Sequence, residues 1–195
     1  MPPKVRFQQQ DIVTAAYELA RKEGLDAINA RSVAGQIGCS TQPIFRVFEN
    51  MEQLKARVFE KAVRRFSDFI EENKNCCESP FKSLGMAYLL YAMEEPHLFH
   101  MVFMRHPVEK PAEVQAFNCR DLVIETLMEK SGFSAEQASA IHMHMWVYTY
   151  GLAAMLATDQ FKFSTEELSD LINLEYRAVV SALTCEDTKQ ILPPV

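Results

Sequence analysis

The chain has 195 residues, of which 48% are hydrophobic and 24% charged, and its formal net charge is −6 at pH 7. This length and composition suit a globular helical protein with a buried core in one large or two small domains. The sequence lacks both an apolar run of about 18 residues and the apolar core of a secretory signal, so we expect a cytoplasmic protein without a membrane partner.

The charge is divided unevenly along the chain. Residues 1–65 hold eleven Lys and Arg against seven Asp and Glu, a balance of +4, whereas residues 66–195 hold nine against nineteen, a balance of −10. A basic N-terminal third could approach phosphate, and the acidic remainder would face away from it. The division favours nucleic-acid binding by the N-terminal third.

The N-terminal third begins with a helical pattern. An arm over residues 1–9, whose two basic side chains could reach phosphate or merely be solvated, precedes a helix predicted over residues 10–23. Gly24 can end that helix, and Asn29 is a candidate cap for a second helix that would end at Ile37.

Two short helical patterns around a tight turn occupy residues 31–48. Val33 and Ile37 are four positions apart and share a helix face, and Ile44 and Phe48 repeat this spacing after the turn. The pattern predicts a helix-turn-helix motif whose two helices pack through these side chains.

The residues of the turn support this prediction. Gly38 can adopt the left-handed conformation that ends a helix, and Ser40 could accept a hydrogen bond from the first N–H groups of the next helix. Pro43 would sit in the first turn of that helix, predicted over residues 41–48, where a missing N–H costs nothing.

The segment from Ile12 to Leu54 resembles the DNA-binding domain of the TetR family of bacterial transcription regulators. The matching segments are AAYELARKEG, SVAGQIGCS, FRVF and NMEQL, in the order of the family pattern. Two positions depart from it, because Phe45 stands where Tyr is usual and Met51 where Lys is usual. Two common phosphate contacts are therefore absent.

The predicted DNA contacts centre on the second helix of the motif, whose N-terminal residues enter the major groove in such proteins. Gln42 could pair with an adenine edge and Arg46 with guanine or phosphate. The resemblance implies a base or phosphate contact for Arg31, and Lys55 could replace the missing Lys. The complete predicted set is Arg31, Ser40, Thr41, Gln42, Pro43, Phe45, Arg46 and Lys55.

A long helix follows the motif. Asn50 is a good cap for a helix running to about residue 72, and its apolar stripe repeats at steps of four residues. Some twenty residues span about 30 Å, so this helix could act as a lever between two domains. We expect a helix-turn-helix domain over residues 1–50 and a helical ligand-binding and dimerisation domain over residues 51–195.

The second domain reads as helices joined by short polar connections, which makes the fold class all-α. The segment MAYLLYAMEEPHLFHMVFM is similar to one found in many TetR ligand-binding domains, although it is less specific than the N-terminal match. After a loop over residues 74–80, helices are predicted over residues 80–94, 96–104, 108–130, 135–157 and 165–184.

The last two predicted helices indicate a homodimer. The final helix carries an apolar stripe too broad to be left in water, and the helix before it carries small side chains that allow close approach. Two helices from each subunit would form a four-helix bundle, as the resemblance also implies, although a core within one chain is the alternative. The stripe consists of Leu168, Leu171, Ile172, Tyr176, Val179, Val180 and Leu183.

Methionine and aromatic residues could line an adaptable apolar pocket in the second domain. Any one of them is more often an ordinary core residue. The resemblance implies a small hydrophobic effector, and a buried acid would favour a cationic one. The predicted ligand-binding residues are Met86, Tyr91, Phe99, Phe103, Phe117, Met143, Trp146 and Tyr150.

Metal, cofactor and redox chemistry find little support. His142 and His144 are two positions apart and point to different sides of a helix, so they cannot chelate one ion. The cysteine spacing fits no zinc or redox motif, and reduced thiols are expected, although the adjacent Cys76 and Cys77 would be reactive if exposed. The five cysteines are Cys39, Cys76, Cys77, Cys119 and Cys185.

Catalysis is not expected, because the sequence shows no nucleophile turn, HExxH motif or phosphate-binding glycine loop. Glu94 and Glu95, which precede Pro96, read as a solvated helix end. The function expected is that of a regulator, most simply a repressor released from a palindromic operator by an apolar effector. A helical ligand-binding or scaffold dimer that has lost DNA binding, and a small helical enzyme, are the alternatives.

Overall fold

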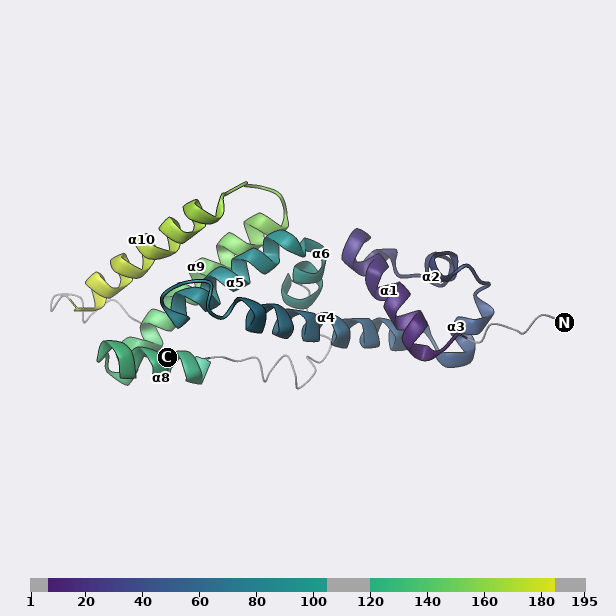
Figure 1. The fold of residues 1–195 in the computed structure, drawn as a ribbon, viewed down its shortest axis with the longest axis horizontal. Helices are drawn as coiled ribbons and strands as arrows, with labels where there is room; N and C mark the ends of the chain where they lie inside the picture. The colour runs from purple at the N-terminus through teal and green to yellow at the C-terminus, as the bar shows by residue number, and fades with distance from the viewer. Residues whose placement is uncertain (1–6, 105–119, 185–195) are drawn as a thin grey trace.

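The computed structural model describes residues 7–104 and 120–184, and every regular element within those ranges is helical, which confirms the all-α prediction (Figure 1). A small N-terminal group of helices and a larger C-terminal group are joined by the long helix α4 (Met51–Asn73). The first group contains α1 (Gln9–Glu23), the 3-10 turn η1 (Leu25–Ala27), α2 (Ala30–Ile37) and α3 (Gln42–Val47). The second contains α5 (Pro80–Glu94), α6 (Pro96–Phe99), the π-helical turn η2 (His100–Met104), α8 (Arg120–Ser131), α9 (Ala135–Ala157) and α10 (Thr165–Thr184).

Most predicted helix boundaries agree with the structure. The helices predicted over 80–94, 135–157 and 165–184 coincide with α5, α9 and α10. The segment predicted as one helix over 96–104 is instead the short α6 followed by the wider turn η2. Of the helix predicted over 108–130, the part before residue 120 lies outside the described residues.

The N-terminal helices share one small core. Ile12 and Ala16 of α1, Val33 of α2, and Ile44 and Phe48 of the α3 segment are all buried. Helix α1 packs against both α2 and the first part of α4. The apolar spacing of the sequence therefore identified the inner sides of these helices correctly, and α3 is held by its buried side.

The turn between α2 and α3 follows the predicted chemistry in one part and departs from it in another. Gly38 has φ 76° and ψ 37°, the left-handed conformation expected after α2. Ser40 does not cap α3, because that helix begins at Gln42 and its cap residue is Thr41, whose side chain makes no capping bond. Capping by Ser40 would have used the N–H of residue 42 or 43, and Pro43 has none.

Replacing Gly38 by alanine should lower the free energy of unfolding by about 1–2 kcal/mol, because an L-residue is strained in this conformation. A Cβ there would meet no atom within 4 Å, so the expected cost is purely that of the backbone. Gly35→Ala is the matched control: it lies inside α2 with equally open surroundings and should stabilise by about 0.5–1 kcal/mol. Urea unfolding of both variants tests this, and equal effects would contradict it.

Helix α4 connects the two helical groups. Asn50 caps it as predicted, with its Oδ1 accepting a hydrogen bond from the N–H of Gln53 at 2.9 Å. The predicted stripe of Leu54, Val58, Ala62 and Phe66 is buried along its length. The helix has 23 residues, or about 35 Å at 1.5 Å per residue. It packs on α1 near its start and on α5 and η2 further along.

Helix α9 is the centre of the C-terminal group. It packs against α5, α8 and α10, and also contacts α6 and η2. Ala138, Ile141, Met145 and Ala153 are its most enclosed apolar contributions to the core. None of the helices within residues 7–104 and 120–184 has the length and apolar character needed to cross a bilayer.

Candidate DNA-binding surface and effector-domain sites

Helix α3 presents three of the predicted DNA contacts outward. Gln42, Phe45 and Arg46 are exposed, with 51% of Phe45 accessible, whereas Ile44 and Phe48 are buried. The buried pair fixes one side of α3 to the domain core, so the other side is left for a partner. Phe45 is thus not a core residue.

The other predicted contacts surround this side of α3 to different degrees. Arg31 in the first turn of α2 and Ser40 in the turn are exposed. Thr41 and Pro43, at the start of α3, are half-buried. Their contacts with DNA stay predictions.

Lys55 has a partner of its own within α4. Its Nζ donates a hydrogen bond to Glu52 Oε1 at 2.9 Å, and the Glu52 side chain is 81% exposed. Exposed ion pairs of this kind contribute less than about 1 kcal/mol, so a phosphate could displace Glu52.

A salt bridge joins the two helical groups. Arg21 near the end of α1 donates from Nε to Glu95 Oε2 at 2.7 Å and from its Nη2 to the second oxygen. Glu95 lies at the corner between α5 and α6, where its side chain is 4% exposed, whereas that of Arg21 is 47% exposed. The interpretation of Glu95 as a solvated helix end is therefore wrong. The hydrogen bond from Arg21 to Glu95 raises the pKa of the Arg21 guanidinium.

Two tyrosines lie near this salt bridge. Burial and the negative charge of Glu95 raise the pKa of Tyr17 to about 12. The hydroxyl of the buried Tyr91 has no hydrogen-bond partner within the described part of the chain. A cavity of about 230 Å³ lies where the end of α1 and η1 meet α6 and η2. It is lined by Glu23, Gly24, Leu25, Asp26, His97, His100 and Met101.

The predicted ligand-binding residues of α5, α6 and η2 belong to a packed aromatic cluster. Tyr91 and Phe99 are buried and Phe103 is half-buried. Ring centroids are 5.0 Å apart for both Phe66–Tyr91 and Phe99–Phe103. Met86 is also buried. Such edge-to-face and tilted contacts stabilise a core.

The predicted residues of α9 differ in burial, although the rings of Trp146 and Tyr150 are neighbours with centroids 6.3 Å apart. Tyr150 is half-buried and its hydroxyl donates to the carbonyl oxygen of Phe103 at 3.2 Å. Met143 and Trp146 are 45% and 55% exposed, so the structure does not bring them into the aromatic core. Phe117 lies outside the described residues.

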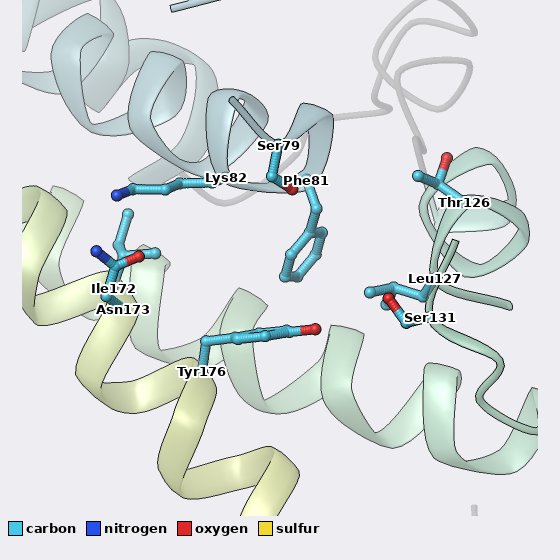
Figure 2. Close-up of a pocket in the computed structure, with 9 residues that line it drawn as sticks. All are labelled: Ser79, Phe81, Lys82, Thr126, Leu127, Ser131, Ile172, Asn173 and Tyr176. Carbon is cyan, nitrogen blue, oxygen red and sulfur yellow. The ribbon is translucent and has the colours of Figure 1, made fainter. Parts of the chain in front are cut away.

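A cavity that the sequence did not reveal lies between α5, α8 and α10 (Figure 2). Its volume is about 180 Å³, smaller than most ligand pockets. The rings of Phe81 and Tyr176 face it from α5 and α10 with centroids 5.8 Å apart, and Leu127 of α8 lies opposite. Lys82 Nζ donates to Ser169 Oγ at 2.6 Å. The lining residues are Ser79, Phe81, Lys82, Thr126, Leu127, Ser131, Ile172, Asn173 and Tyr176.

Helix α10 packs its predicted apolar stripe against its own chain. Leu168, Ile172 and Val179 are buried, and the other four stripe residues are half-buried against the same core, so the stripe predicted for dimerisation belongs to the intrachain core. Large apolar side chains nevertheless remain exposed on both helices of the predicted interface. They are Met143, Trp146 and Val147 on α9 and Leu174 on α10.

The comparisons with known proteins agree with this architecture. Residues 81–179 match the family model described as the tetracyclin repressor-like C-terminal domain. Over 189 residues, 94% of this chain and 96% of the relative, the chain is 23% identical to the uncharacterised HTH-type transcriptional regulator YobS of Bacillus subtilis.

Two solved structures from Rhodococcus sp. RHA1 share the fold. A TetR-like transcriptional regulator has a TM-score of 0.62 and 16% identity, with 92% of this chain and 98% of that chain covered. A protein with unknown function has a TM-score of 0.69 and 19% identity, with 91% and 98% covered.

Proposed function

The chain belongs to the TetR family of transcription regulators, and we propose that it is a homodimeric repressor that a small molecule releases from a palindromic DNA operator. The observation that carries the proposal is the outward side of α3, where Gln42, Phe45 and Arg46 are exposed while Ile44 and Phe48 anchor the helix. Residues 1–65, which include the first part of α4, also hold eleven of the twenty Lys and Arg of the chain against seven Asp and Glu, and this balance of +4 favours contact with phosphate.

Two copies of the chain are needed to read a palindrome. Dimerisation through α9 and α10 would cover the exposed Trp146, Val147 and Leu174. The symmetry of such a dimer would set the two α3 helices against successive major grooves, about 34–36 Å apart.

Replacing Leu174 by arginine should convert the dimer to a monomer. Its side chain is 66% exposed in the single chain, and burying a guanidinium in an apolar dimer interface would be strongly unfavourable. Light scattering should change from a dimer to a particle near 22.3 kDa. The matched control is Gln160→Arg in the connection between α9 and α10, which should stay dimeric. A dimeric Leu174→Arg variant would place the interface elsewhere.

The effector would act through the junction between the two helical groups. A ligand shifts DNA affinity only if it binds one spacing of the α3 helices more tightly than another, and about 1.4 kcal/mol of difference changes affinity tenfold. Helix α4 and the Arg21–Glu95 salt bridge are the connections that such a change would move.

The ligand itself should be small and mostly apolar. The rings around Phe103 are in contact with one another, so a ligand entering there would separate them, whereas the cavity beside Phe81 and Tyr176 is already present. A thermal-shift screen of hydrophobic compounds should find binders that raise the melting temperature. Phe81→Ala should weaken the binding of a compound that occupies the cavity. Phe103→Ala should weaken the binding of a compound that enters the aromatic core.

A mobility-shift titration with DNA from upstream of the protein's own gene tests the proposed function. We expect a retarded complex that a hundredfold excess of unrelated DNA does not remove. If specific and unrelated DNA compete equally, the chain has retained the family fold but lost its specific DNA binding.

Met51→Lys should make DNA binding more salt-dependent. The substitution places a cation at the start of α4, where the family usually has one, and adds a phosphate contact in each subunit. Each new contact steepens the slope of log K against log salt concentration by about 0.9, so the slope for a dimer should become steeper by about 1.8. Anisotropy titrations at several salt concentrations measure this slope, and an unchanged slope would show that position 51 does not reach the backbone.

A further inference from the structure

Two adjacent cysteines lie in the turn between α4 and α5, at the opposite end of α4 from the helix-turn-helix motif. Both thiols are free. Cys76 is exposed, whereas Cys77 is half-buried. The two Sγ atoms are 3.8 Å apart. Neither residue lines the cavity beside Phe81 or lies on the predicted DNA-binding surface. We call this pair the Cys76–Cys77 dithiol.

The backbone of the turn is held in place by a buried side chain. Ser83 on α5 is fully buried, and its Oγ both accepts a hydrogen bond from the N–H of Cys77 at 3.0 Å and donates one to the Cys77 carbonyl oxygen at 3.2 Å. Cys76 Sγ lies 3.7 Å from the carbonyl oxygen of Ser83. The separation of the sulfur atoms is therefore set by packed structure rather than by a freely moving loop.

The close spacing of the two Cα atoms disfavours a direct bond between the sulfur atoms. Consecutive Cα atoms are about 3.8 Å apart across a trans peptide, outside the usual disulfide range of about 4.4–6.8 Å. A trivalent, pyramidal atom bonded to both sulfurs at about 2.3 Å, the length of a metal–thiolate bond, with an angle near 100° would instead require them to be about 3.5 Å apart. The dithiol, with its sulfur atoms 3.8 Å apart, is already close to that separation.

The surroundings decide which kind of atom could bridge the pair. Structural zinc needs about four protein ligands, and within residues 7–104 and 120–184 no group of three or more His, Cys, Asp or Glu could hold a metal ion. Soft thiol ligands select soft, thiophilic centres. A trivalent arsenic atom that carries its own organic substituent needs only two sulfur ligands from the protein.

We propose that the Cys76–Cys77 dithiol binds trivalent organoarsenic compounds as a two-sulfur chelate. With an organoarsenic oxide, two As–S bonds form as the bond between arsenic and oxygen breaks, and the two thiol protons leave with that oxygen as water. Arsenic stays trivalent and neither sulfur is oxidised. Burial raises the pKa of the Cys76 thiol.

Intact-mass spectrometry of the full chain with phenylarsine oxide in excess 2-mercaptoethanol tests the proposal. We expect one phenylarsenic group per chain with loss of water, resistant to the monothiol and removed by 2,3-dimercaptopropanol. Cys76→Ser and Cys77→Ser should each abolish the resistant adduct, and the matched control Cys39→Ser should retain it. An adduct that survives in both single variants, or none on the unmodified protein, would overturn the proposal.

Peptide mapping of the unmodified protein gives a second readout that needs no variant. Arsenic should be found on the peptide that contains Cys76 and Cys77, and arsenic on another cysteine would count against the site. Because binding is measured without DNA, the result is independent of the proposed repressor function.

Discussion

Replacing Arg46 by alanine is expected to weaken operator binding by about tenfold or more while leaving the chain folded and dimeric. A guanidinium that pairs with a guanine edge contributes about 1–3 kcal/mol of discrimination, and a dimer would lose one such contact in each half-site. Arg46 is exposed in the last turn of α3, so its removal should cost little stability. Anisotropy titrations of wild type and variant at one salt concentration measure the loss.

Arg64→Ala is the matched control for charge. Arg64 is also exposed, and it lies thirteen residues beyond the first residue of α4, about 20 Å along the helix axis from its start. Loss of this charge should change DNA affinity by less than about threefold, since contacts beyond a Debye length are screened. Equal effects of the two variants would mean that binding senses net charge alone, and α3 would lose its proposed role.

Arg21→Ala should destabilise the protein more than Glu95→Ala, although both remove the same salt bridge. The first change strands a carboxylate whose side chain is 4% exposed, and breaking a buried pair in this way costs about 3 kcal/mol or more. The second leaves a guanidinium that is 47% exposed and can hydrate, so we expect about 1–2 kcal/mol. The difference arises from the burial of the group left behind.

Urea unfolding of both single variants and of the double variant measures this asymmetry. The double variant should be no less stable than Arg21→Ala, because it removes the stranded carboxylate. Arg57→Ala, which breaks the exposed α4 pair with Glu60, should cost less than about 1 kcal/mol. If Arg21→Ala and Glu95→Ala had equal effects, the carboxylate would be better hydrated than the structure indicates.

Local sequence signals predicted the helices because each acts within one or two turns of chain. The left-handed Gly38 ends α2, the side chain of Asn50 caps α4, and Pro80 opens α5. The prediction that Ser40 caps α3 was wrong. A capping side chain bonds an N–H two or three residues further along the chain, and one of those two residues here is Pro43, which has no N–H.

Contacts between distant segments could not be predicted in this way. Glu95 and its partner Arg21 are 74 residues apart, and nothing near Glu95 distinguishes it from the exposed Glu94. The cavity beside Phe81 and Tyr176 has walls from three helices and needs their packing before it exists.

Helix α9 shows a further limit. It is apolar on most sides, so its sequence does not reveal which side faces the core. The sequence therefore predicts Met143 and Trp146 as residues of a ligand pocket, whereas the structure exposes them. An apolar helix with an exposed side is also what a subunit interface requires.

Hydroxyl-radical footprinting of the protein on its own upstream DNA tests the proposed dimeric repressor most directly. The paired α3 helices predict two symmetric protected half-sites whose centres lie about 10–10.5 base pairs apart, or a multiple of that spacing, both lost in the variant Gln42→Ala, Arg46→Ala. A single protected patch, or protection that survives this double substitution, would contradict the account.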